Sequence, residues 1–432
     1  MKIYDYQQAF GAADKTSKAM KEAVESWFDA YYQKTQTAAS DPCQRIAYTI
    51  VNKIVKAVFG EYQTSARDKA ARQLLDKLEE KKKEALQLAL IGGECYLKPC
   101  PEEDGFSFTL IPRNRVLIFA RNEKGEPTDI GTVQCLTGGN DYFTLLERRW
   151  LDEAGLLRIE NRLFRSRNPQ SLGNQVPLTA VKEVEHLPDS YRFEVPLGGL
   201  GIARMKSPIL NCVDGSEDGV AVFAPAMGLI RNIDQNEAQL VGEFSRGESR
   251  IIASADLLDK EQGLAEHLFV GLDEDPEQVG ITVFSPQLRF EAYLERKQEY
   301  LRNVESVVGL RRGMLSDTNM EDRTATEITS SAGDFNLTVM EFQSMWEEAL
   351  GKILAICKVL GGLYGLPAIR DTAVSVDWGN STLYDEDKLW QDYRQMVLDG
   401  LLAPEVALGW RFGLPADSEA ERQAIRQKYM PG

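Results

Sequence analysis

Apolar residues recur at helical spacing in three N-terminal segments, residues 14–39, 44–60 and 66–91. In the second segment Ile46, Ile50 and Ile54 lie four positions apart. This is the spacing of one face of an amphipathic helix. The third segment ends at Gly92-Gly93, which is a helix stop signal. The N-terminal part of the chain is therefore predicted to be helical.

After this segment, apolar residues recur at every second position. From about residue 93 to 210 the chain breaks into short alternating stretches, separated by turn signals such as "NEKGEP" and "LTGGND". Alternation of this kind is typical of half-buried strands. The stretches are "ECYLKPC", "FSFTLIP", "RVLIFAR", "IGTVQCL", "YFTLLERRW", "LLRIENRLF" and "AVKEVEHL". Together they predict an antiparallel sheet region.

Helical spacing returns at residue 223 and continues to about residue 244. The residues that mark the inner face of this helix are Ile230, Ile233, Leu240 and Val241. A second helix is predicted over 285–310, with Ser285 as its N-cap and Pro286 at its first position. Between the two helices, "RIIASA", "HLFVG" and "ITVFS" read as short strands. The pattern predicts a helical hairpin with a small β domain at its tip.

The longest helical pattern covers residues 324–362. Thr324 and Glu327 form a T-x-x-E capping box, and Gly361-Gly362 supply the stop. Its apolar stripe consists of Ile328, Ala332, Phe335, Val339, Phe342, Trp346, Ala349, Ile353, Ile356 and Leu360. The preceding stretch, "GLRRGMLSDTNMEDR", has no apolar period and is not expected to pack as core. A strand, "AVSVDW", and helical segments over 384–400, 403–411 and 417–429 follow.

The composition is that of a globular protein, with 43% hydrophobic and 27% charged residues among 432. A chain of this length predicts roughly two to four domains. The net charge of −16 argues against an interface that wraps nucleic acid, because such interfaces are usually basic. No apolar run approaches the ~20 residues that span a bilayer, and the start has no apolar signal region. We therefore expect a protein made in a cytoplasm, with its six cysteines reduced.

The sequence carries no motif for catalysis. It contains no G-x-x-x-x-G-K-[ST] phosphate loop and no G-x-G-x-x-G after a predicted strand. Its two histidines, His186 and His267, lie far apart. Cys95 and Cys100 lack the further ligands that a zinc site requires. We expect no catalytic residue, no cofactor and no bound metal.

A metal-dependent hydrolase is the enzymatic alternative. The segment "DGSEDG" at residues 214–219 places Asp214 and Asp218 close together. Two carboxylates can bind a divalent cation, but the segment lacks the register of an EF-hand loop. Glycines and short acids also make ordinary turns. The sequence alone leaves this alternative open.

The order of the elements is more informative than any single motif. The chain begins with helices and a β region, followed by a helix, a small acidic β domain and a second helix. It continues with a polar loop, a very long helix and a helical tail. This order resembles that of the portal proteins of tailed double-stranded-DNA bacteriophages, in particular long-tailed phages of Gram-positive hosts. The segments that carry the resemblance are "GSEDGVAVFAPAMGLIRNIDQNEAQLVGEFSRGESRIIAS" (215–254), "SPQLRFEAYLERKQEYLRNVESVVGL" (285–310), "TATEI" (324–328) and "LDGLLAPEVAL" (398–408).

The resemblance implies an α+β portal fold with a wing, a helical stem, a β-rich clip and a crown that is short for the family. The expected parts are an N-terminal helical segment 1–39, the wing 40–222, the first stem helix 223–245, the clip 246–284, the second stem helix 285–308, the tunnel loop 309–323, the long helix and wing return 324–380, and the crown 381–432.

The resemblance also implies a function and partners. A ring, commonly of twelve subunits, would occupy one capsid vertex and form the channel for double-stranded DNA during packaging and ejection. The terminase large subunit and a head-completion or adaptor protein would dock on it, and the major capsid and scaffold proteins would surround it. The expected location is the virion, after assembly in the host cytoplasm and without a membrane. Another structural protein of the phage neck is the alternative in this setting.

Two candidate sites follow from the resemblance. The tunnel loop would project into the channel through Arg311, Arg312, Gly313, Ser316, Asp317 and Asn319. Three arginines and three acids balance in this loop, so it would touch DNA without holding it. The clip would offer a docking turn that contains Asp273, Glu274, Asp275 and Glu277. Residues 247–284 hold nine acids and two lysines or arginines, a net charge of −7 (9 − 2 = 7).

Overall fold

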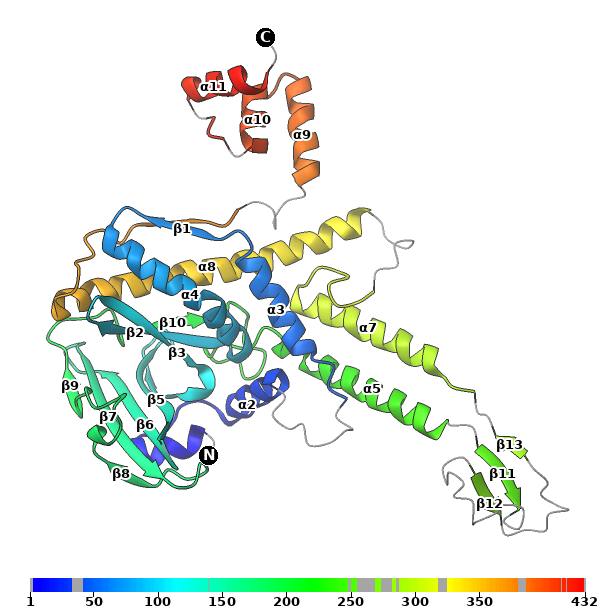
Figure 1. Ribbon diagram of the computed structural model, residues 1–432, viewed down its shortest axis with the longest axis horizontal. Helices are drawn as coiled ribbons and strands as arrows, with labels where there is room; N and C mark the ends of the chain where they lie inside the picture. Colours follow the sequence, from blue (N-terminus) through cyan, green and yellow to red (C-terminus); the bar gives the residue numbers. More distant parts are fainter. Residues whose placement is uncertain are drawn as a thin grey trace. The chain divides into compact units, whose positions relative to one another are not determined.

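The computed structural model describes residues 3–32, 42–138, 140–247, 250–254, 269–272, 282–284, 287–317, 325–379, 386–412, 414–416 and 418–430 (Figure 1). The chain forms two compact units. The first contains Met1–Val55 and Asp68–Thr372, and the second contains Lys56–Arg67 and Ala373–Gly432. Helices and sheets are both present, which confirms the expected α+β class.

Helices form the N-terminal part of the chain, as the spacing predicts. They are η1 Ile3–Tyr6, α1 Gln7–Phe10, α2 Lys18–Tyr32, α3 Ile46–Val58 and α4 Lys69–Gly92. The predicted face of α3 is buried, with Ile50 and Ile54 fully inaccessible. At the start of α4 the Asp68 side chain accepts a hydrogen bond from the Ala71 N–H (3.0 Å). The helix ends at Gly93, whose φ of 78° suits glycine.

Two antiparallel sheets follow α4. The smaller has the order β10-β2-β3, and the larger has the order β4-β5-β6-β7-β8 with β9 paired to β7. The strands are β2 Glu94–Glu102, β3 Gly105–Pro112, β4 Val116–Arg121, β5 Pro127–Gly138, β6 Asp141–Leu151, β7 Leu157–Ser166, β8 Asn174–Val176, β9 Ser190–Arg192 and β10 Ala203–Lys206. All of these pairings are antiparallel, so the predicted sheet region is confirmed.

The predicted strand "AVKEVEHL" (180–187) is wrong. After η3 Leu178–Ala180 the chain makes two successive turns. The Val184 N–H bonds to the Val181 carbonyl (3.1 Å), and the Leu187 N–H bonds to the Val184 carbonyl (3.0 Å). The apolar residues here recur every three positions rather than every two. A chain that turns after each third residue can therefore direct all of them to one side.

Two helices form a hairpin that carries a small sheet (Figure 1). η4 Ala224–Ala226 leads into α5 Met227–Arg246, and the return helix is α7 Phe290–Val308. Figure 1 shows α5 and α7 side by side, with the small sheet beyond their ends. Its strands are β11 Arg250–Ser254, β12 Phe269–Leu272 and β13 Thr282–Phe284, in the order β12-β11-β13. The predicted hairpin with a β insert is confirmed.

Helix α7 begins later than predicted. Its first residue is Phe290, whereas Ser285 and Pro286 lie outside the described residues. The residue before the helix is engaged with α5, because the Arg289 guanidinium pairs with Glu243 (3.0 Å). This contact belongs to the hairpin and is not visible as a local capping signal.

The inner face of α5 is shorter than predicted. Ile230 and Ile233 are buried, but Val241 is 60% exposed. The buried face is continued by Asn236, whose Nδ2 donates a hydrogen bond to the Tyr293 carbonyl of α7 (3.0 Å). A polar residue thus joins the two helices where the pattern suggested only apolar packing.

Helix α8, Ala325–Tyr364, is the predicted long helix. It begins directly after Thr324, which lies outside the described residues, as do the side chains of Ile328 and Ala332. The rest of the predicted stripe is buried. At 40 residues the helix is ~60 Å long.

The end of α8 lies beyond the predicted stop at Gly361-Gly362. Gly365 has a φ of 68°, and the Leu366 N–H bonds to the Gly361 carbonyl (2.9 Å). This is the closing bond of a Schellman motif. Gly361 supplies a carbonyl to the motif, and Gly365 supplies the left-handed conformation, so the helix continues to Tyr364.

The second unit joins two segments that are distant in sequence. β1 Gln63–Ala66 pairs antiparallel with β14 Val374–Asp377. The Trp378 ring lies against Tyr62, with centroids 4.8 Å apart. The predicted C-terminal helices are α9 Glu386–Leu398, α10 Pro404–Phe412 and α11 Glu419–Tyr429. Arg426 of α11 pairs with the buried Glu405 of α10.

A glycine crossing fixes the point where the chain leaves the sheets for α5. A Cβ on Gly219 would lie only 2.2 Å from the Gly93 carbonyl oxygen. Just beyond the crossing, the Val222 N–H bonds to the Leu90 carbonyl (2.9 Å), and residues Val220 to Phe223 are fully buried. Only residues without a side chain permit this approach of two backbones.

We predict that Gly219→Ala destabilises the first unit by about 1–3 kcal/mol, because the new methyl group overpacks a rigid backbone contact. Thermal unfolding followed by circular dichroism measures the effect. The matched control is Gly351→Ala on the exposed face of α8, where no atom lies within 4 Å of the added Cβ. The control should be neutral or slightly stabilising. Equal melting temperatures for Gly219→Ala and the wild type would contradict this account of the crossing.

Candidate functional site

A tight turn follows α7. Gly309 ends the helix with a φ of 75°. The Met314 N–H then bonds to the Arg311 carbonyl (3.1 Å), and Gly313 has a φ of 87°. A type II turn needs a positive φ at its third residue, which is Gly313 here. The predicted site residues that the structure describes all belong to this turn or directly follow it: Arg311, Arg312, Gly313, Ser316 and Asp317.

A buried carboxylate holds the turn against α7. Glu305 is 1% exposed. Its Oε1 accepts hydrogen bonds from the backbone N–H groups of Gly313 (3.0 Å), Leu315 (2.5 Å) and Ser316 (2.8 Å). Its Oε2 accepts the Ser316 hydroxyl (2.8 Å). All four partners are donors, which matches the acceptor-only chemistry of a carboxylate.

Further contacts place the turn between two helices. The Gln298 side chain of α7 donates to Asp317 Oδ2 (2.9 Å) and accepts the Asp317 N–H (2.8 Å). On the other side, a Cβ on Gly309 would lie 2.6 Å from Thr338 Oγ1 of α8. The turn is therefore held by α7, and Gly309, at the helix end just before the turn, packs against α8.

The expectation that this stretch does not pack as core is wrong for Leu310 and Ser316. Leu310 and Ser316 are 4% and 5% exposed. Arg311 and Arg312, by contrast, are exposed. The folded turn thus presents two cationic side chains while its far side is buried. The last predicted residue of the site, Asn319, lies outside the described residues.

The predicted clip site also lies outside the described residues. Its members are Asp273, Glu274, Asp275 and Glu277. Strands β11, β12 and β13 are the described parts of that segment. The acidic character of residues 247–284 is therefore an observation from the sequence.

A second polar cluster lies at the glycine crossing, between β2, β4, β10 and the loop before α5. Glu94 is fully buried and accepts hydrogen bonds from Arg204, from the Tyr96 hydroxyl (2.7 Å) and from the Gly219 N–H (2.8 Å). Arg113, which is 1% exposed, lies 3.8 Å from the same carboxylate. The contacts with Arg204 and Gly219 join segments that are more than 100 residues apart in sequence.

Asp218 extends this cluster towards α5. Its Oδ1 accepts from Arg113 (3.4 Å) and from Arg121 (2.5 Å). Arg113 also donates to the Val116 carbonyl (2.8 Å) and to the Thr16 hydroxyl (2.9 Å). The N-terminal segment, the larger sheet and the approach to α5 are thus tied to one set of buried charges.

The electrostatics of the cluster favour ionised Glu94. Burial by itself would raise the pKa of the Glu94 carboxyl, but the Arg204 and Arg113 guanidiniums outweigh burial and hold its pKa at about 2. Burial raises the pKa of the Tyr96 phenol, and the Glu94 charge raises it further. The phenol therefore stays protonated and remains a donor to Glu94.

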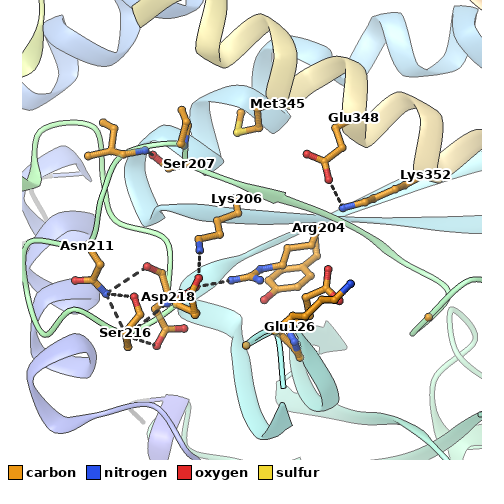
Figure 2. A pocket seen from close by; sticks show the side chains of 18 of the residues that line it. Glu126, Arg204, Lys206, Ser207, Asn211, Ser216, Asp218, Met345, Glu348 and Lys352 are labelled. Carbon is orange, nitrogen blue, oxygen red and sulfur yellow. Dashed lines mark hydrogen bonds and ion pairs between the residues drawn. The ribbon is translucent and has the colours of Figure 1, made fainter. Parts of the chain in front are cut away.

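An open polar cavity of about 880 Å³ lies beside this cluster (Figure 2). Figure 2 shows that side chains from α8 line one side, and that the loop between β10 and α5 lines the other. Lys206 pairs with Glu217 (2.9 Å), and Lys352 pairs with Glu348 (2.6 Å). Cationic and anionic side chains are mixed along the walls, so the cavity lacks the single sign of charge that attracts a polyanion.

The carboxylates proposed for the hydrolase alternative have other partners. Asp218 is held by two arginines, as described above. Asp214 accepts hydrogen bonds from the Ser17 hydroxyl and from the Asn211 amide (2.9 Å). Within the described residues, no group of three or more His, Cys, Asp or Glu side chains is arranged to hold a metal ion. Cys95 is buried in β2, where burial raises the pKa of its thiol.

The apolar spacing of the sequence did not predict the roles of the buried Glu94 and Glu305. A signal for Glu305 was present, because it falls within the buried face of α7 formed by Leu301, Val304 and Val308. A charged residue in such a stripe requires buried partners. Glu94 lies at the start of a strand and gives no comparable signal.

The whole-chain comparison agrees with the order of elements. A sequence model of phage portal proteins matches residues 18–428. The chain is therefore a phage portal protein, a structural component of the phage head. It belongs to the family described as phage portal protein, SPP1 Gp6-like. No curated protein matches the chain. Across the described part of the chain, no helix is long and apolar enough to cross a membrane.

We predict that Glu94→Gln lowers stability at pH 7 by about 3 kcal/mol, because it removes the carboxylate that pairs with the partly buried Arg204. The folded-state pKa of Glu94 is depressed, so its contribution is complete above its unfolded pKa and is lost as pH falls towards about 2. Urea unfolding at a series of pH values should therefore show that the difference in free energy of unfolding between wild type and variant becomes smaller below about pH 4.3.

The control for this series is Glu22→Gln on α2, because Glu22 is exposed and pairs with the exposed Lys18 one turn earlier. It should change stability by no more than about 0.5 kcal/mol. If the loss of unfolding free energy caused by Glu94→Gln stayed constant from pH 7 to pH 3, this would contradict the electrostatic account.

Proposed function

We propose that this portal protein assembles into a closed ring, of twelve subunits as is common for the family, at one capsid vertex. Double-stranded DNA passes through the ring during packaging and ejection. The turn at residues 311–317 faces the channel. The observation that supports this most directly is the turn itself, which hydrogen bonds attach to α7 and which exposes Arg311 and Arg312. A head-to-tail contact that closes on itself would generate such a ring.

The parts of the portal fold are assigned as follows. Helices α5 and α7 form the stem, the sheet β12-β11-β13 forms the clip, and residues 309–323 form the tunnel loop. The wing consists of residues 40–222 with the long helix and return at 324–380, and the crown consists of residues 381–432. Charged side chains along α5 and α7, such as Arg296 and Glu291, are available for pairing between neighbouring stems.

The acidic clip is the proposed docking surface for the terminase large subunit and for the head-completion or adaptor protein. Residues 247–284 carry nine acids against two lysines or arginines. A basic partner would be steered to this surface, and DNA inside the ring would be repelled from it. The major capsid and scaffold proteins would contact the outside of the ring.

We expect the double variant Arg311→Ala/Arg312→Ala to form rings but to package DNA more slowly. Its packaging rate should also depend less on salt, because phosphate contacts through arginine are salt-sensitive. An in vitro packaging assay at several salt concentrations measures both effects. The control is Arg167→Ala, which removes an exposed arginine from a distant loop. A packaging rate equal to that of the wild type at every salt concentration would contradict the proposed contact between the turn and DNA.

The docking proposal has its own test. Replacing Asp273, Glu274 and Asp275 with neutral amides should leave the ring assembled and slow its association with the terminase or adaptor. The dependence of the association rate on salt should become flatter, since screening acts over ~8 Å at physiological salt. Surface plasmon resonance across a salt series measures this rate. Unchanged association rates would contradict the docking role proposed for these residues.

A further inference from the structure

Glu305 is placed where an acidic residue does not help its own helix. It lies in the last turn of α7, which ends at Val308. Carbonyl groups at a helix C-terminus favour cations over anions. Its side chain is also 1% exposed, and burying a charge is costly unless it is fully hydrogen-bonded. The residue therefore stabilises the structure only through the groups that it binds.

Those groups belong to one short segment. The three N–H groups of Gly313, Leu315 and Ser316 converge on Oε1, and the Ser316 hydroxyl binds Oε2. Successive backbone N–H groups in a turn form a concave site for an anion. Here the anion is a side chain of α7, so the site serves to attach the turn to the helix.

The backbone of Glu305 makes a second attachment. The Glu305 carbonyl accepts a hydrogen bond from the Gly309 N–H. It accepts a second one from the Leu310 N–H (2.8 Å). One residue thus binds the chain on both sides of Arg311 and Arg312. The two exposed arginines lie on a bridge of chain whose two ends are fixed to the same point on α7.

We propose that Glu305 is a positioning residue that holds Arg311 and Arg312 at a fixed place on the ring for contact with the phosphates of passing DNA. This inference rests on the proposed role of the turn in the channel. A fixed arginine pair meets each phosphate without the entropy cost of ordering a flexible loop. Loss of the carboxylate would free residues 313–316 and allow the arginines to move away from the DNA.

Three variants separate positioning from folding. Glu305→Ala leaves the backbone N–H groups of the turn without an acceptor. Glu305→Gln keeps a carbonyl oxygen that accepts hydrogen bonds from these N–H groups. Its NH₂ group can donate to the Ser316 hydroxyl oxygen. The variant therefore removes the charge of residue 305 and retains its hydrogen bonds to the turn. The matched control is Glu299→Ala, which removes an exposed glutamate six residues earlier on α7 (61% side-chain exposure).

Amide hydrogen exchange in assembled rings tests the attachment. Glu305→Ala should lower the protection of the amides at 313, 315 and 316 by about tenfold or more, the effect of losing one net hydrogen bond. Glu305→Gln should retain most of the protection, and Glu299→Ala should leave it unchanged. Unchanged protection in Glu305→Ala would overturn the inference.

The packaging assay tests positioning. Glu305→Ala should slow packaging as much as Arg311→Ala/Arg312→Ala does. The triple variant should be no slower than either, because residues that act as a unit are not additive. If Glu305→Ala fails to assemble, Ser316→Ala provides the same comparison through loss of the Oε2 partner alone.

Two outcomes contradict the proposal in different ways. If the arginine variant packages slowly but Glu305→Ala and Ser316→Ala package normally, the channel role stands and the positioning role is overturned. If the arginine variant itself packages normally, the DNA contact proposed for the turn is wrong, and the inference fails with it.

Discussion

The geometry of the first unit depends on the ion cluster and glycine crossing at the end of α4. Arg204 and Arg113 neutralise the buried Glu94, and the Gly219 N–H joins the same carboxylate. The crossing of Gly93 and Gly219 brings the two backbones into contact. These interactions determine where the chain leaves the sheets and enters α5. The hairpin, the turn after α7 and the start of α8 follow from that point.

Glu94 and Glu305 show two ways of accommodating a charge in a protein interior. Glu94 is balanced by guanidinium groups from β10 and from the segment before β4. Its environment holds together elements that are distant in sequence, and loss of the carboxylate would remove the counter-charge of Arg204. Glu305 is satisfied by backbone N–H groups and a hydroxyl from a segment only about ten residues away. The first arrangement serves the stability of the unit, and the second shapes one local turn.

Local periodicity was sufficient to predict most of the elements. The buried faces of α3 and α8 follow from apolar spacings of three and four residues, and the antiparallel strands β2 to β7 follow from a spacing of two. Errors arose where contacts distant in sequence or a different period decided the structure. Residues 180–187 repeat every three positions and form turns, and Arg289 pairs with Glu243 before α7 begins. The pairing of β1 with β14 joins segments about 300 residues apart, which no local pattern reveals.

The candidate turn was found from the order of elements and not from its chemistry. Its lack of an apolar period suggested a stretch without packing, yet hydrogen bonds to Glu305 fold it as far as Ser316. Polar groups that satisfy one another leave no trace in a hydrophobic pattern. The acid within the buried face of α7 was the one visible indication. Its partners are backbone groups, which the sequence does not distinguish from any others.

Electron cryomicroscopy of the purified protein tests the central claim most directly. The account predicts closed rings with a central channel, in which residues 311–317 of every subunit line the channel wall and Glu305 contacts the backbone of 313–316. Rings in which this turn lies on the outer surface, or a protein that stays monomeric at all concentrations, would contradict it.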